Sequence, residues 1–375
     1  MFVHGLTVHI STKSTPFRAP TMIVRSISAA LFIVLVVAGC SSSRRAPSAS
    51  GITVATRMDP QVPSLRAADR VRIVEAFRLA DALGDSVWTG WSAVPFAVLL
   101  VTPTQEFLFR HPHPSPDFVR VLDDLSLGGA VYTRARVFPS TFLATFPAVG
   151  GVPTVVVGQA DQTGKTSTEW VLTLIHEHFH QLQMSAPGYW AGVNALGLTR
   201  GDTTGMWMLD YPFPYDSADV QRRFQLAWGR LRAAVGVDGS GSVGGANGAS
   251  AVAALRSSLD SLRAGLAPDD YRYLAFQLWQ EGVARYTEYA MAERAAGSFA
   301  PSAEFLALPD QESFAVVAAR LRRGILGDST LALGKRRRVA FYPFGAAAAL
   351  ALDATGAGWR RRYLVAGYAL DPLLR

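Results

Sequence analysis

The segment LTLIHEHFHQLQ, residues 172–183, constrains the fold more than any other stretch of this 375-residue chain. On that segment, His176 and His180 are four residues apart, so on a helix both imidazoles lie on one face, with Cβ atoms about 5–6 Å apart. We therefore predict a helix over 167–184 that is seated in the protein core. Its apolar residues recur at helical spacing and would form the buried stripe: Leu172, Ile175, Phe179 and Leu182.

The same residues contain the pattern H-E-x-x-H, which is typical of a zinc-binding helix. Imidazoles at His176 and His180 can bind one Zn²⁺ at Zn–N distances of about 2.0–2.1 Å. Glu177, beside the first histidine, can then reach a water molecule at the metal and act as its general base. His178 points to a different face, and we expect it to pack or to support a ligand. The alternative is that the histidines are buried core residues without a metal.

A catalytic zinc site requires a third protein ligand, which must come from outside this helix. A metzincin would have a histidine six residues after His180, but Ala186 stands there. We predict Glu281, on a helix over 269–295, because a helix holds a ligand more rigidly than a loop does. The alternatives are four other acidic residues: Asp202, Asp210, Asp216 and Glu288.

Residues 279–284, WQEGVA, resemble the helix that carries the third zinc ligand in gluzincin metallopeptidases, including the aminopeptidase N-like branch; only one spacing residue after the tryptophan is missing. A second resemblance lies in FYPFGAAAALALDATG, residues 341–356, which is similar to the helix start that carries the transition-state tyrosine of this branch. Tyr342, Gly345 and Ala346 match that helix start. The resemblance implies a zincin-like fold and the following site: zinc ligands His176, His180 and Glu281, with Tyr342 as a catalytic residue.

The chain departs from the gluzincin pattern in three places. The gap between His180 and Glu281 is much longer than in the family, so an insertion over 185–268 must separate the two helices. Phe344 stands where the family has a lysine. No G-x-M-E-N segment, which binds the free amine of an aminopeptidase substrate, precedes the zinc helix; residues 153–159 would be the edge strand that normally carries it. We therefore expect an endopeptidase or an unusual peptidase rather than an aminopeptidase.

Hydropathy patterns predict an α+β fold, with a mixed or antiparallel sheet followed by a mostly helical lobe. Residues 52–166 would form the α/β part with the sheet, and 167–375 the helical lobe that carries the zinc helix. A helix is expected at 67–83, and strands at 95–101, 105–109, 130–138 and 153–158. Further helices are expected at 217–235, 251–264, 311–324 and 343–355, with a Gly/Ser-rich surface loop at 236–250.

The N-terminus has the layout of an export signal. Residues 1–39 would be an upstream extension plus a lipoprotein signal peptide, because a basic start and a short apolar run lead into VAGC. This ending resembles the lipobox of bacterial lipoproteins, which implies lipidation of Cys40, the only cysteine, with 40–51 as a flexible tether. We expect a cell-envelope lipoprotein on the outer membrane. An uncleaved membrane anchor is the alternative.

Charge and loop patterns exclude two other classes of function. Removal of residues 1–39 takes away three basic residues and no acidic one, so the net charge falls from +7 to +4. The basic runs 335–338 and 360–362 are expected to be solvated faces, and nucleic-acid binding is excluded for an exported chain. The segment 158–168 resembles a phosphate loop but has Gln159 where the first glycine must stand, so nucleotide binding is excluded as well. Ser167 or Thr168 would instead cap the zinc helix.

These observations predict a zinc-dependent peptidase that is attached to the cell envelope by a lipid and acts on a peptide or protein substrate. Zn²⁺ would be its cofactor, the metal ligands His176, His180 and Glu281, and the catalytic residues Glu177 and Tyr342. The alternative is a non-catalytic lipoprotein in which zinc stabilises a scaffold or binding module. Metal content and peptide hydrolysis distinguish the two.

Overall fold

The computed structural model describes residues 64–236, 248–356 and 358–374, all of which belong to one compact unit, Pro60–Arg375. Residues 1–63 lie outside the described residues. The signal segment, lipidation at Cys40 and the tether therefore stay predictions. Within the described ranges, no helix is both long enough and apolar enough to cross a membrane.

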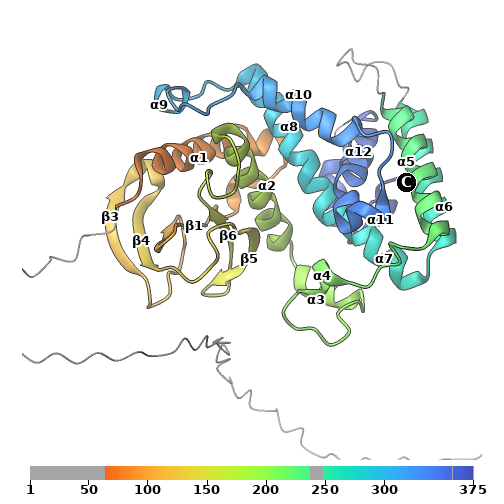
Figure 1. The fold of residues 1–375 in the computed structure, drawn as a ribbon, viewed down its shortest axis with the longest axis horizontal. Coiled ribbons are helices and arrows are strands. Elements are labelled where there is room, and N and C mark those ends of the chain that lie inside the picture. Colours follow the sequence, from red (N-terminus) through yellow and green to blue (C-terminus); the bar gives the residue numbers. More distant parts are fainter. Residues whose placement is uncertain (1–63, 237–247, 357, 375) are drawn as a thin grey trace, which may run out of the picture. The chain divides into compact units, whose positions relative to one another are not determined.

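A six-stranded mixed sheet forms one part of this unit, and its strand order is β3-β4-β2-β1-β6-β5 (Figure 1). β1 and β6 are parallel, and every other neighbouring pair is antiparallel. The strand bounds are β1 Val98–Val101, β2 Gln105–Phe109, β3 Val119–Asp124, β4 Gly129–Ala135, β5 Leu143–Val149 and β6 Val152–Gly158.

Helices α1 (Ala67–Val87) and α2 (Ser167–Ser185) cover one face of the sheet. Side chains alternate along a strand, so Val98 and Leu100 of β1 pack with these helices in the main core. Leu99 and Val101 point the other way, into a smaller core of their own that four phenylalanines of the strands and loops complete: Phe118, Phe138, Phe142 and Phe146.

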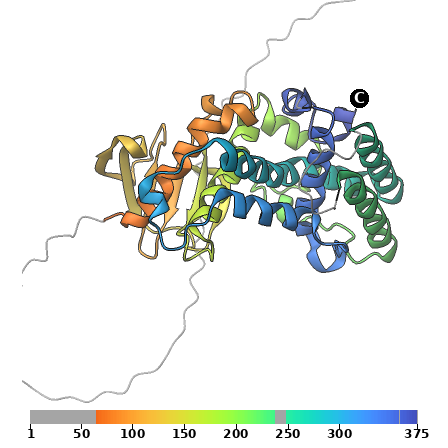
Figure 2. The ribbon, with the colours of Figure 1, turned by 90° about the horizontal axis from the view of Figure 1, so that it is seen from above.

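The helical lobe follows α2 in the chain. In both Figure 1 and Figure 2 the sheet lies at one end of the unit and the pair α5 and α6 at the other. Helix α12 packs against α5, α6, α8 and α10, so it forms the centre of the lobe. The longer helices are α5 Ala218–Val235, α6 Gly248–Gly265, α7 Pro268–Gln277, α8 Val283–Ser298, α10 Phe314–Leu326 and α12 Phe341–Asp353. The short ones are α3 Tyr189–Ala195, α4 Trp207–Asp210, α9 Ala303–Leu306, α11 Leu333–Arg336 and α13 Gly358–Tyr363.

The α+β prediction, with a sheet first and helices afterwards, is confirmed. Two strands were missed: β3, whose side chains are mostly exposed or half-buried, and β5, in which Pro147 interrupts the strand pattern. The expected edge strand at 153–159 is wrong, because β6 pairs with β1 on one side and with β5 on the other. β5 is the edge strand instead. Of the predicted loop at 236–250, residues 237–247 lie outside the described residues, and residues 248–250 belong to α6, which begins at Gly248.

Candidate metal centre

Helix α2 is fixed at its start by a capping box at Thr166. The Thr166 hydroxyl accepts a hydrogen bond from the Glu169 amide, and the Glu169 carboxylate accepts one from the Thr166 amide. The predicted cap at Ser167 or Thr168 is therefore wrong. Those two hydroxyls instead donate hydrogen bonds to Asp310 and to the main-chain oxygen of Glu312, which tie the start of α2 to the loop before α10.

The structure brings His176, His180 and Glu281 together. The Glu281 Oε2 atom lies 3.8 Å from His176 Nε2 and 3.6 Å from His180 Nε2, and the three ligand atoms all lie within 4.8 Å of one another. In a tetrahedral zinc site with bonds of about 2.0–2.1 Å, two ligand atoms are roughly 3.3 Å apart. Among the described residues this is the one group of three or more His, Asp, Glu or Cys side chains with such spacing.

A hydrogen bond to Gln183 sets the tautomer of His180. The Gln183 Nε2 atom lies 3.3 Å and 3.0 Å from the main-chain oxygens of Trp279 and Gln280, so it must be the donor end of the amide. Gln183 Oε1 is then the acceptor that faces His180 Nδ1 at 2.7 Å. The proton of His180 therefore sits on Nδ1, and the lone pair of Nε2 is directed at the cluster.

A carboxylate has the same effect on His176. Glu288 Oε2 lies 3.4 Å from His176 Nδ1 and 2.7 Å from Nη1 of Arg285. Burial opposes charging of the imidazole, but the carboxylates of Glu281 and Glu288 outweigh it and raise the pKa of His176 to about 9. The surroundings of this imidazole thus favour a positive charge, which is the electrostatic condition for holding a cation.

Glu281 lies in a π-helical turn, Leu278–Gly282, between α7 and α8. The next residue, Gly282, touches Gly345 of α12: a Cβ on Gly282 would lie 2.4 Å from the Gly345 Cα, and one on Gly345 would lie 2.6 Å from the Gly282 Cα. Only glycine at both positions allows these backbones to approach so closely. This contact places the start of α12, with Tyr342, beside Glu281.

Arg338 connects Glu281 with Tyr342. Its Nη1 atom donates to Glu281 Oε1 at 3.2 Å and to the Tyr342 hydroxyl at 2.8 Å. Burial disfavours the charged form of Glu281, yet the two nearby imidazoles and the charge of Arg338 hold the pKa of Glu281 well below its usual value. Burial and the nearby charge of Glu281 raise the pKa of Tyr342 well above 10, so its hydroxyl keeps its proton at neutral pH.

Tyr342 also lies against the first histidine. Its ring is nearly parallel to the ring of His176, with the centroids 6.4 Å apart. The predicted catalytic tyrosine is therefore part of the cluster, at the first turn of α12.

Glu177, the predicted base, is buried and contacts the edge strand. The Thr145 hydroxyl of β5 lies 2.9 Å from both the main-chain oxygen and Oε2 of Glu177. Its negative charge contributes to the raised pKa of the neighbouring His176. The carboxylate is thus held at the edge of the sheet, next in sequence to His176.

The remaining residues named from the sequence lie elsewhere. His178 packs, as expected: it stacks on Phe96 with centroids 3.9 Å apart, and burial lowers its pKa to about 3. Asp202 accepts bonds within its own turn, and Asp216 pairs with Arg337 at the surface. Asp210 is exposed and outside the cluster. Glu288 contacts the Nδ1 side of His176 rather than the cluster side.

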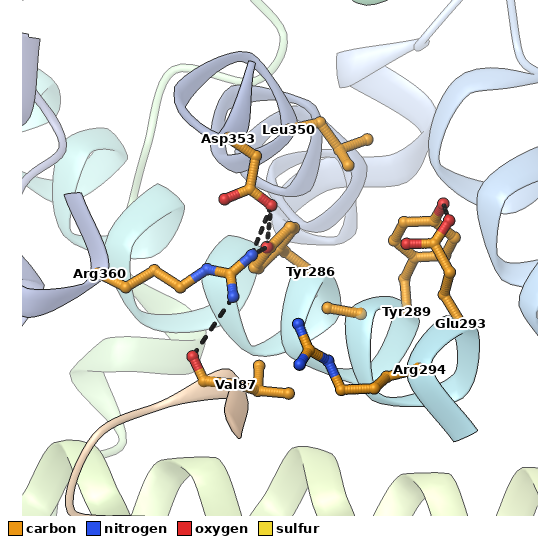
Figure 3. Close-up of a pocket in the computed structure, with 9 residues that line it drawn as sticks. Val87, Tyr286, Tyr289, Glu293, Arg294, Leu350, Asp353 and Arg360 are labelled. Atoms are coloured by element: carbon orange, nitrogen blue, oxygen red, sulfur yellow. Dashed lines mark hydrogen bonds and ion pairs between the residues drawn. The ribbon is translucent and has the colours of Figure 1, made fainter. Parts of the chain in front are cut away.

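The predicted solvated basic runs are partly wrong. Arg338 is only 21% exposed and points to Glu281, and Arg360 is only 14% exposed. Figure 3 shows Arg360 directed at Asp353 and Tyr286, at a separate cavity of about 250 Å³. That cavity is lined by Val87 at the end of α1 and by residues of α8, α12 and α13, and none of them is a predicted site residue.

Three side chains at the centre were not assigned their present roles from the sequence, although each had a local signal. Gln183 is one helical turn after His180, and Glu288 is two turns after Glu281. Arg338 is one turn before Tyr342. Residues three, four and seven apart on a helix share a face, so all three could have been proposed as partners of the site residues.

The donor set fits a divalent metal ion. Two imidazoles and one carboxylate are typical zinc ligands, their reactive atoms converge, and the far nitrogen of each imidazole is held by an acceptor. The described part of the chain can therefore hold a metal ion at this point. No family model, curated protein or solved structure matches the chain.

Proposed function

We propose that the protein is a zinc-dependent peptidase. The observation that carries this proposal is the convergence of His176 Nε2, His180 Nε2 and Glu281 Oε2, 3.6–3.8 Å from carboxylate to imidazole, next to an acidic residue and a tyrosine. The distances exceed those of direct hydrogen bonds and come close to the edge of a zinc tetrahedron, so the cluster is better suited to an ion than to its own internal bonds.

The number of ligands favours catalysis over a structural role. Structural zinc sites are closed by four protein ligands, whereas catalytic sites have three and leave one position for water or substrate. Within the described ranges, the cluster contains three such groups. This count supports an enzyme rather than a scaffold that zinc merely stabilises.

Each nearby side chain has a role in amide hydrolysis. When bound, zinc in such a site makes water nucleophilic at neutral pH and polarises a carbonyl group. Glu177 takes the proton from the attacking water and delivers it to the leaving amine nitrogen. Tyr342, whose hydroxyl stays protonated, donates a hydrogen bond to the negative oxygen that develops on the attacked carbonyl.

The edge strand supports a peptide as the substrate. Among the described strands β5 pairs only with β6, so its other edge is available to bind an extended peptide main chain. Thr145 of this strand contacts Glu177, so a peptide on that edge would pass the proposed base. This arrangement favours hydrolysis of peptide bonds within an extended segment.

The test combines metal content with hydrolysis of a peptide library. We expect about one zinc per chain and peptide cleavage that a chelator abolishes and added zinc restores. His180→Ala should lose the zinc and all activity, since only two ligands remain. Glu177→Gln should keep the zinc and lower kcat by about 10²–10⁴-fold, because only the base is removed.

Two results would contradict the proposal. Full activity in Glu177→Gln would exclude the role of this residue as the base. Zinc binding without turnover of any peptide would favour the non-catalytic scaffold.

As part of the same proposal, a lipid on Cys40 holds the enzyme at the cell envelope, on the outer membrane. Cys40→Ala should therefore move the protein from the membrane fraction to the soluble fraction, and unchanged membrane attachment would contradict lipidation at this residue.

A further inference from the structure

Arg338 uses only one of its nitrogen atoms within the protein. Its Nη1 atom contacts Gln277 at 3.5 Å, Glu281 at 3.2 Å and Tyr342 at 2.8 Å. Neither Nε nor Nη2 of Arg338 has a hydrogen-bond partner among the described residues. These two atoms are also not enclosed, because the buried side-chain nitrogens without a partner in the described ranges are Trp91 Nε1 and Arg360 Nε. One side of this guanidinium group is therefore open.

The guanidinium group of Arg338 lies close to the three candidate ligand atoms. Glu281 directs Oε2 to the two imidazoles and Oε1 to Arg338, so the guanidinium group is separated from the cluster by the width of one carboxylate. A peptide residue spans roughly 3.3–3.6 Å. A substrate whose scissile carbonyl lies at the cluster can thus reach Arg338 with a group about one residue further along its chain.

The N–H donors of Arg338 that have no partner indicate which chemical group of the substrate would bind there. A guanidinium group presents N–H donors in a fixed fork that matches the two oxygens of a carboxylate. Lys335 is exposed three residues before Arg338 and adds a positive charge that attracts anions, whereas Arg336 and Arg337 are paired with Asp328 and Asp216.

We propose that Arg338 binds a carboxylate of the substrate about one residue beyond the scissile bond. This inference rests on the proposed peptidase function and specifies its substrate class. The carboxylate comes either from the free C-terminus of the peptide, which makes the enzyme a carboxypeptidase, or from an Asp or Glu side chain within the peptide. In both cases Nη1 of Arg338 keeps its contacts with Glu281 and Tyr342, and the open donors bind the substrate.

The test uses one N-acetylated peptide library in two forms, with free C-termini and with C-terminal amides, and the zinc-loaded full chain. We expect kcat/KM for the free acids to exceed that for the amides by about tenfold or more, because a hydrogen bond to a charged group is among the stronger ones. Cleavage confined to free acids identifies the C-terminal carboxylate. Cleavage of amides one residue before Asp or Glu identifies the side chain.

Two variants assign the effect to Arg338. Arg338→Lys retains the positive charge but removes the fork, so the preference for a carboxylate should fall to near unity while the zinc content stays at the wild-type level. Arg337→Ala is the matched control, because Arg337 is exposed and pairs with Asp216 instead. The control should keep the full preference. A preference that survives unchanged in Arg338→Lys would overturn the assignment.

A binding measurement separates failure of this inference from failure of the proposed function. N-acetyl-leucine and its amide are titrated into the zinc-loaded chain by calorimetry, which requires no turnover. Tighter binding of the acid, lost in Arg338→Lys, supports the carboxylate site even if no peptide is hydrolysed. Equal binding of acid and amide, or equal cleavage of both libraries with no preference for Asp or Glu beyond the scissile bond, refutes the site and leaves the peptidase proposal standing.

Discussion

The helical lobe contains two clusters built from the same kinds of side chain. One joins Arg338, Tyr342 and the carboxylate of Glu281. The other joins Arg360, Tyr286 and Asp353, beside the cavity in Figure 3. Both clusters contain one residue of α12. The first also contains Glu281 of the π-helical turn, and the second contains Tyr286 of α8, the helix that follows this turn.

The two clusters differ in whether both oxygens of the carboxylate accept hydrogen bonds at normal distances; in the second cluster they do, although Arg360 Nε has no partner among the described residues. Asp353 Oδ2 accepts hydrogen bonds from both Arg360 and Tyr286, and Asp353 Oδ1 accepts one from Trp359 Nε1 at 2.7 Å. Glu281 Oε2 instead faces two imidazole nitrogens at 3.6 Å and 3.8 Å, beyond hydrogen-bond distance. A closed network stabilises a fold, whereas a converging set of acceptors that do not touch can bind an ion. Residue types alone therefore do not identify a metal site, whereas the distances between their nitrogen and oxygen atoms do.

The largest difference in activity is expected between variants of the two tyrosines, Tyr342 in the first cluster and Tyr286 in the second. Tyr342→Phe should lower kcat by about 10²–10³-fold with KM and zinc content nearly unchanged, because one donor to the developing oxyanion is lost. Tyr286→Phe is the matched control and should leave the kcat of the folded enzyme unchanged. Steady-state kinetics and zinc analysis check both. Equal kcat values in wild type and Tyr342→Phe would mean that Tyr342 only packs against Arg338 and His176.

Much of the cluster around Glu281 could be predicted from the sequence, because two of its three candidate ligands lie close together on one helix. His176, Glu177 and His180 take their relative positions from helix geometry alone. Glu281 lies 100 residues after the helix that it meets, so periodicity could not place it. It was preferred to the other acidic residues because it lies on a predicted helix, and because the segment around Trp279 and Gly282 resembles gluzincins. The contact between Gly282 and Gly345 is the physical reason why these segments carry small residues.

The closed cluster could not be predicted in the same way. Arg360, Asp353 and Tyr286 come from three helices and match no spacing rule, and Arg360 sits in a run that charge alone assigns to solvent. The edge strand β5 was missed for a related reason. Pro147 and a register shift after Phe146 break its alternation, and only pairing with β6 identifies it as a strand.

The next contrast concerns the carboxylates of α8. Glu288→Gln should weaken zinc binding by about 10–100-fold, because Glu288 holds the His176 ring through Nδ1. Glu293→Gln is the matched control on the same helix, since Glu293 contacts the Tyr289 hydroxyl and no histidine. Competition with a chromogenic chelator measures both affinities. If Glu288→Gln bound zinc as tightly as the control, the orientation of His176 would have to depend on Glu281 and packing alone.

The smallest effect on activity is expected when the closed cluster is opened. Asp353→Asn removes the charge that compensates Arg360, whose side chain is only 14% exposed, and the Tyr286 hydroxyl loses its ionic acceptor. The free energy of unfolding should fall by about 1–3 kcal/mol, because a buried charged group is left without its partner. Zinc content and the kcat of the folded protein should stay at wild-type values, since Asp353 touches no residue of the metal centre. Urea denaturation and kinetics on the same preparation test this pairing of results. A large loss of kcat with zinc retained would show that α8 and α12 transmit changes from one cluster to the other, and the closed network would then have to be counted as part of the catalytic apparatus.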